Sequence, residues 1–242
     1  MAYTILLISS LSIFSTIIGV FWAKNCADRP KIVAGAIGFS TAIMLYLSVF
    51  ELFIKPMQLL PWQNVIFWFL IGVIVVAIID WILPHIHHHN TKNTKQDSLI
   101  MMALLIAIGM VIHDFPEGFA IAGTYLNNSN WGWLVGLGVA IHNIPEEFAM
   151  ALPLIITGQK KTLLILAIFS ALAEPMGALL GISTGETFAN WLLPMTIFAG
   201  GAMFFIAIGE LMPFGLRIKH FGSFIMGIII GLVSFGILAS LF

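Results

Sequence analysis

Two short motifs place ionisable residues inside otherwise apolar sequence. HDFPEG runs from His113 to Gly118 and HNIPEE from His142 to Glu147, so each contains a histidine and a glutamate four residues apart around a proline. Residues at i and i+4 share one face of a helix. A charged residue in an apolar membrane span costs about 2.5–3.5 kcal/mol on insertion scales, so such residues are normally kept for function. The duplication indicates one site built from two helices.

The polar side chains of these motifs are of the kinds that bind first-row divalent metals. A further carboxylate, Glu174 in ALAEPMG, also precedes a proline, and no lysine or arginine in the neighbouring apolar sequence balances these acids. Imidazole with carboxylate suits Zn²⁺, Fe²⁺ and Mn²⁺, and shared carboxylates can bridge two ions about 3.5–4 Å apart. Protons or bound cations must therefore compensate the negative charge. The candidate metal ligands are His113, Asp114, Glu117, His142, Asn143, Glu146 and Glu174, with Glu147 as an additional candidate.

The composition places these residues in a membrane. Hydrophobic residues make up 60% of the chain and charged residues 9%, against about a quarter charged in soluble domains. The apolar residues form blocks of about 20, the length of a transmembrane helix, without the alternation of a barrel strand. We therefore predict an all-α, multi-pass protein with a single transmembrane domain, 1–242. Its eight spans are expected near 2–23, 32–54, 62–84, 99–124, 132–157, 162–183, 188–212 and 222–242.

The basic residues predict the orientation of the spans. Nine of the ten lysines and arginines fall in the four connections on one side, and Lys55 is the exception. The positive-inside bias makes that side cytoplasmic and both termini extracytoplasmic. The single cysteine, Cys26, excludes a disulfide within the chain and a multi-thiolate metal cage.

The two motifs are expected at the same depth. Each histidine lies about a dozen residues from the connecting segment TYLNNSN, or roughly 16 Å, which is near the bilayer midplane. Glu174 is at a similar depth in its own span. Pro116 and Pro145 each remove a helical hydrogen bond and kink the helix, which membrane helices tolerate where the break lines a polar cavity.

A weaker repeat points to transport. FSTAIMLYLSVFEL (39–52) aligned without gaps to FAGGAMFFIAIGEL (198–211) pairs Glu51 with Glu210 and gives four identities. This predicts an inverted 3+2+3 repeat, in which spans one to three match spans six to eight around the two motif helices. Such repeats, with a midplane site on broken helices, are typical of alternating-access transporters. Glu51 and Glu210 are either way-stations for a cation or end residues that reach toward water.

These segments resemble one known family. HDFPEGFAIA, HNIPEEFAMALP and ALAEPMGALLG are similar to the fourth, fifth and sixth helices of the ZIP (Zrt/Irt-like) divalent-metal transporters, in particular the compact bacterial branch. The second and seventh helices of that family resemble FSTAIMLYLSVFE and FAGGAMFFIAIGELMP. The resemblance implies eight helices with a 3+2+3 inverted repeat, external termini, and metal import into the cytoplasm through a midplane centre that can be binuclear.

The resemblance also divides the candidate ligands into two sites. The principal site would comprise His113, Glu117, His142 and Glu146. The second would comprise Asp114, Asn143 and Glu174, with the two glutamates shared. The chain departs from the family at two positions: Asp114 stands where asparagine is usual, and Glu147 where glycine follows the glutamate.

Two further patterns allow two interpretations each. The cytoplasmic loop 85–98 begins HIHHH, and such histidine-rich tracts bind metals or serve as polar linkers; its histidines are His85, His87, His88 and His89. Gly227 and Gly231 form a GxxxG motif, which packs either within the bundle or against a second protomer to give a homodimer.

We therefore expect a multi-pass importer of zinc or a related divalent metal in the inner or plasma membrane. Its partners would be metal ions and lipid, without nucleic acid, and the metal would be cargo, with no prosthetic group. Uptake should fall below about pH 6, because histidine must be neutral to bind metal and its pKa is about 6.5. The alternatives are an intramembrane metallohydrolase and a metal-independent proton or sodium carrier. The lack of H-E-x-x-H and the inverted repeat favour a transporter over an enzyme.

Overall fold

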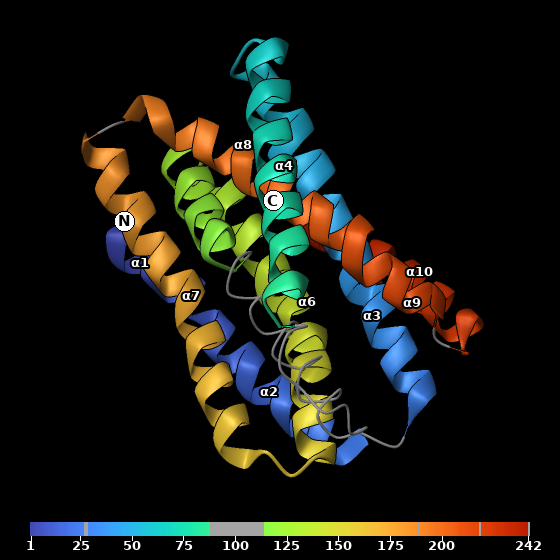
Figure 1. Ribbon diagram of the computed structural model, residues 1–242. Coiled ribbons are helices and arrows are strands. Elements are labelled where there is room, and N and C mark those ends of the chain that lie inside the picture. The colour runs from blue at the N-terminus through green and yellow to red at the C-terminus, as the bar shows by residue number, and fades with distance from the viewer. Residues whose placement is uncertain (27–28, 88–113, 188, 218, 242) are drawn as a thin grey trace.

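The computed structural model describes residues 1–26, 29–87, 114–187, 189–217 and 219–241, which are almost entirely helical and contain no strand (Figure 1). The predicted all-α class is confirmed. Residues 114–127 are helical, and the other elements are α1 (Ala2–Ser9), α2 (Leu11–Cys26), α3 (Pro30–Tyr46), η1 (Leu47–Ile54), η2 (Lys55–Gln58), α4 (Trp62–His87), α6 (Ser129–Ile156), α7 (Lys160–Thr187), α8 (Ala189–Ile206), η3 (Ala207–Leu211), α9 (Met212–Arg217) and α10 (Phe221–Ala239).

Several helices are long and apolar enough to cross a membrane. Six such spans lie within the described residues: Ala2–Cys26, Pro30–Gln58, Trp62–Ile79, Ser129–Ile156, Lys160–Thr184 and Phe221–Ala239. Leu193–Gly209 is a shorter apolar helix. The chain is a multi-pass membrane protein, while the total of eight spans and the external termini stay predictions.

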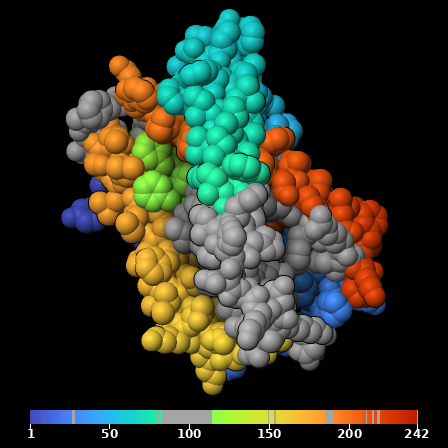
Figure 2. Space-filling model, viewed as in Figure 1, coloured from blue at the N-terminus to red at the C-terminus, as the bar shows by residue number. Residues whose placement is uncertain are grey.

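The outer surface fits an apolar solvent. α4 stands at the front of the molecule (Figure 2). Its outward positions carry large apolar side chains. The exposed residues include Trp62, Phe67, Leu70, Ile74, Ile78 and Trp81. In water these side chains would form an unusually large apolar patch, whereas lipid tails solvate them without cost.

The helices pack in two groups. The motif bundle, as we call it, consists of α1, α2, the 114–127 helix, α6 and α7, and in it α2 runs along α6 (Figure 1). The repeat bundle consists of the continuous α3–η1–η2 segment, α4, α8, η3, α9 and α10; in it α3 packs along α10 and α4 along α8. The main described crossing between the groups is that of α3 with α6.

The two segments matched by the repeat share an irregularity. η1 and η3 are both π-helical, and they contain Glu51 and Glu210 at the positions that the ungapped alignment pairs. π-helical turns are rare and occur frequently at functional sites. Their equivalent placement supports the predicted repeat.

The GxxxG motif packs within the molecule. A Cβ at Gly227 would overlap the backbone of Gly35, and one at Gly231 would lie 2.8 Å from the Phe39 carbonyl oxygen. Small residues let α10 approach α3 closely. This surface is therefore occupied by α3 and is not available to a second protomer.

Candidate metal centre

Five candidate ligands meet where the 114–127 helix, α6 and α7 cross: Asp114, Glu117, His142, Asn143 and Glu174. His113 lies outside the described residues, but the six other principal candidates are all buried, with exposed fractions of 4% or less: Asp114, Glu117, His142, Asn143, Glu146 and Glu174. The structure thus gathers on three helices the groups that the sequence places near one depth.

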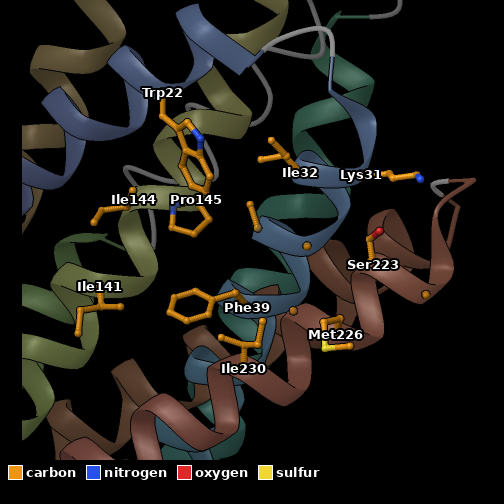
Figure 3. Close-up of a pocket in the computed structure, with 14 residues that line it drawn as sticks. Trp22, Lys31, Ile32, Phe39, Ile141, Ile144, Pro145, Ser223, Met226 and Ile230 are labelled. Atoms are coloured by element: carbon orange, nitrogen blue, oxygen red, sulfur yellow. The ribbon is translucent and has the colours of Figure 1, made fainter.

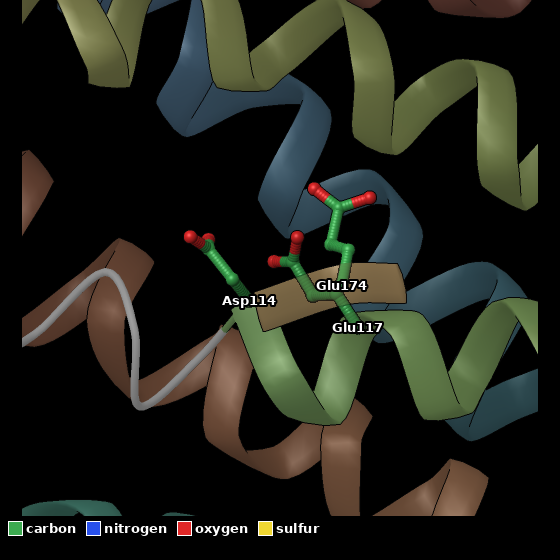
Figure 4. Close-up of side chains that lie close together, drawn as sticks. All are labelled: Asp114, Glu117 and Glu174. Atoms are coloured by element: carbon green, nitrogen blue, oxygen red, sulfur yellow. The ribbon is translucent and has the colours of Figure 1, made fainter. Parts of the chain in front are cut away.

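Three carboxylates form the centre of this cluster. Asp114 and Glu117 project from the 114–127 helix and Glu174 from α7, and one oxygen of each lies within 4.8 Å of those of the other two (Figure 4). Two ionised carboxylates at that distance repel by about 3 kcal/mol at an effective dielectric constant of about 20. The cluster therefore needs bound cations or protons to be stable.

A close approach of two backbones makes the cluster possible. A Cβ at Gly118 would overlap the carbonyl oxygen of Glu174, and one at Gly177 would overlap that of Phe115. Glycine at both positions lets the 114–127 helix lie against α7. This explains why the first motif ends in glycine, since a side chain there would separate Glu117 from Glu174.

His142 presents one nitrogen to the carboxylates. Its Nδ1 lies 3.0 Å from the carbonyl oxygen of Gly138, so Nδ1 donates and Nε2 carries the lone pair of the neutral ring. Nε2 lies 3.4 Å from Oε1 of Glu117. Neither Nε2 nor the Glu117 oxygens have a hydrogen-bond partner among the described residues. A metal ion or a proton between the two groups would satisfy both.

Asn143 connects α6 to α7. Its Nδ2 donates to Oε1 of Glu174, which turns that carboxylate toward α6. Its Oδ1 is buried and, within the described part of the chain, has no hydrogen-bond donor. A carboxamide oxygen in this position is a suitable ligand for a divalent cation.

Three hydroxyl groups hold the carboxylates in place. Ser170 donates to Oδ2 of Asp114, Ser40 to Oε1 of Glu146 and Thr16 to Oε1 of Glu147, each at 2.7 Å. These residues were not among the sequence candidates. Ser170 lies four residues before Glu174, so the helical spacing alone places both on one face of α7 and could have identified Ser170. Ser40 and Thr16 come from distant segments, and nothing in their local sequence connects them to the motifs.

The two adjacent glutamates of the second motif face different helices. Glu146 bonds Ser40 on α3, across the boundary between the bundles, whereas Glu147 bonds Thr16 on α2. Gly19 leaves the space for Glu147, because a Cβ there would lie 2.6 Å from its Cβ. Both glutamates lie outside the group of three clustered carboxylates.

Of the candidate residues outside the two motifs and α7, only Glu51 has a side chain that the structure describes. Glu51 is buried in η1, and its Oε2 forms an ion pair with Lys55 Nζ at 2.9 Å. Glu210 lies in η3, and His85 and His87 lie in the last turn of α4, but the structure does not describe these three side chains. His88 and His89 are outside the described residues. The histidine-rich loop therefore stays a prediction.

Each motif proline borders an apolar groove. Pro145 lines a groove of about 660 Å³ between α6 and the α3–α10 pair, with Phe39 and Met226 on the far wall (Figure 3). Pro116 lines a second groove of about 500 Å³, with Val76 of α4 opposite. Both grooves lie between the bundles, so there is open space beside the two proline-containing helices.

Known proteins match this chain along nearly its whole length. Residues 83–241 match the family described as ZIP Zinc transporter. A protein named Zinc transporter ZupT from Chlorobaculum parvum is 33% identical over 96% of both chains. A protein of the same name from Corynebacterium aurimucosum is 34% identical over 100% of this chain and 97% of its own length. Another from Streptococcus mutans is 32% identical over 99% of this chain and 98% of its own length. The chain belongs to the ZIP transporter family.

Proposed function

We propose that this protein carries divalent transition metal ions, zinc foremost, across the membrane through the buried centre. The observation that carries the proposal is the meeting of His142 Nε2 with Glu117 Oε1 beside Asp114 and Glu174, where no described donor satisfies the imidazole nitrogen or the Glu117 oxygens. The relatives described above are named zinc transporters, and imidazole with carboxylate is a ligand set that binds zinc.

The ligands fall into two sets in this proposal. His142 and Glu117 hold the principal metal together with His113 and Glu146. Asp114, Asn143 and Glu174 hold a second metal. The hydrogen bond from Ser170 to Asp114 and the contact of His142 with Gly138 orient ligands, as outer partners do in metal sites.

Transport requires the site to open on each side in turn. Along α6, the residues Trp131, Leu134, Val135 and Val139 precede His142 and belong to the apolar core, which closes that direction. The grooves beside Pro116 and Pro145 leave room for the motif bundle to shift against the repeat bundle. We propose that this shift exposes the centre alternately and that the basic loops mark the cytoplasmic side, which makes the direction inward.

The competing functions predict different behaviour of the same cluster. A metal-independent proton carrier would keep its activity without divalent metal, because protons alone would balance the carboxylates. A metallohydrolase would hold its ion in place with an open position for water. Only a metal transporter moves the ion itself from one side to the other.

Purified protein in liposomes that contain a metal-sensitive dye tests the proposal. We expect influx of Zn²⁺, and of Fe²⁺, Mn²⁺ and Cd²⁺ to different extents, to fall more than tenfold in His142→Ala and in Glu117→Gln. His220→Ala, at the start of α10 and far from the motifs in sequence, is the control and should match the wild type. No influx into wild-type vesicles, or unchanged influx in His142→Ala, would overturn the proposal.

A further inference from the structure

A small polar pocket lies at the start of α6, at the opposite end of that helix from Lys160 and Lys161. It has a volume of about 320 Å³, and its polar lining comes from Lys55, Gln58, Asn127, Asn128, Asn130 and Trp131. Four of these side chains are neutral carboxamides. Trp131 is eleven residues before His142, so the pocket lies roughly 16 Å along the helix from the metal centre.

Lys55 lines this pocket and lies between two partners, of which Trp131 also lines the pocket. Its Nζ is 2.9 Å from Oε2 of Glu51 and 5.0 Å from the centre of the Trp131 ring. The Glu51 side chain is only 9% exposed, whereas that of Lys55 is 39% exposed. The ammonium can therefore leave the carboxylate for water while it stays over the aromatic face, since a cation over tryptophan gains about 0.5–1 kcal/mol at exposed sites.

In the ion pair, the Lys55 ammonium takes the place that a free cation could occupy beside the Glu51 carboxylate. Lys55 is the one basic residue outside the four basic connections, and it lies four residues from a buried carboxylate in a π-helical segment. Without a cation that carboxylate would be buried and uncompensated, which is costly. Because Glu51 already neutralises Lys55, the pocket is not arranged to attract an anion. The carboxamide oxygens of Gln58, Asn127 and Asn130 in the pocket can bind divalent cations or their water shell, whereas Oδ1 of Asn128 accepts from the Trp131 backbone N–H at 3.1 Å.

We propose that Glu51 and the carboxamides of the adjacent pocket form a receiving site for a divalent cation, and that the Lys55 ammonium, which lines the pocket and pairs with Glu51, occupies this site until a metal displaces it. The inference rests on the proposed transport function, and it names Lys55 as a tethered competitor that sets the apparent affinity for entering metal. A metal that takes the Glu51 carboxylate moves Lys55 toward Trp131, the first large side chain of α6. The same helix carries His142 to the main centre.

Transport kinetics of Lys55 variants test this inference. We expect Lys55→Met and Lys55→Gln to lower the KM for Zn²⁺ influx about two- to fivefold, the factor expected for displacing a partly exposed ion pair, with little change in maximal rate. Lys55→Arg should retain the wild-type KM. Lys161→Met is the control, because it removes a lysine at the start of α7, which follows the opposite end of α6. Glu51→Gln should raise KM, and adding Lys55→Met to Glu51→Gln should bring no further change.

A lower KM in Lys55→Met that persists in the Glu51→Gln background, or an unchanged or higher KM in Lys55→Met and Lys55→Gln, would overturn the inference. Calorimetric titration of the detergent-purified variants with Zn²⁺ decides the case independently of transport, since Lys55→Met should gain a tighter site that the double variant lacks. If wild-type vesicles took up no metal while this gain was seen, the proposed function would fail and the receiving site would stand. If the wild type transported metal but Lys55→Met did not differ from it, the receiving site would fail and the proposed function would stand.

Discussion

At the scale of single residues, the two motifs are not equivalent. The first supplies two clustered carboxylates, Asp114 and Glu117, whereas the second supplies the imidazole of His142 and the amide of Asn143. The final positions also differ in role. Gly118 has no side chain and so lets the backbone of α7 approach closely, while Glu147 accepts a hydrogen bond from Thr16 on α2. The two clustered carboxylates of the first motif and the neutral groups of His142 and Asn143 therefore come from different helices.

Removing the hydroxyl of Ser170 tests how closely Asp114 must be positioned. We expect Ser170→Ala to weaken zinc binding about tenfold, because removing an outer partner of a metal ligand typically costs 10–100-fold in affinity. Calorimetry on detergent-purified protein and the KM of vesicle influx are the measurements. Ser183→Ala is the matched control, since Ser183 is on the same helix but is exposed and donates to the Leu180 carbonyl. Equal effects of the two variants would show that Asp114 does not depend on Ser170.

At the scale of helices, much of the arrangement was predictable. The length of the apolar blocks and the basic connections anticipate where the described helices run, while the common membrane depth of the two motifs, counted from TYLNNSN, stays a prediction. The π-helical turns at Glu51 and Glu210 were not predictable, because a shifted hydrogen bond leaves no mark in composition. The contacts of Ser40 and Thr16 were equally hidden, since they depend on how distant helices cross.

The crossing of the 114–127 helix and α7 depends on one missing side chain. Gly118→Ala should destabilise the protein by about 1–3 kcal/mol, as overpacking does, and should lower metal influx, because the new methyl group overlaps the Glu174 carbonyl oxygen. Thermal unfolding in detergent and vesicle influx measure the two effects. Gly236→Ala on α10 meets nothing within 4 Å and should be neutral or slightly stabilising. A Gly118→Ala protein as stable and active as Gly236→Ala would contradict the close approach.

At the scale of the whole molecule, the binding centre and the space for motion are adjacent. α6 turns His142 toward the carboxylates and places Ile141, Ile144 and Pro145 along the groove that faces α3 and α10. The bond from Ser40 to Glu146 crosses the same boundary between the bundles. In the proposed transport cycle, a shift of the motif bundle would break this bond and use the volume of the groove. In this proposal, metal binding and the transport motion are coupled through α6.

Filling the groove should separate binding from motion. Met226 of α10 lines the groove and is 56% exposed, so Met226→Trp adds bulk there without displacing a buried core residue. We expect its maximal influx rate to fall about tenfold, because a filled groove blocks the shift of α6, while zinc affinity in detergent stays at the wild-type value. Ile229→Trp is the control, since Ile229 is on the same helix and 50% exposed but does not line the groove. A loss of zinc affinity in Met226→Trp, or equal rates in the two variants, would show that the groove is not the space into which α6 moves.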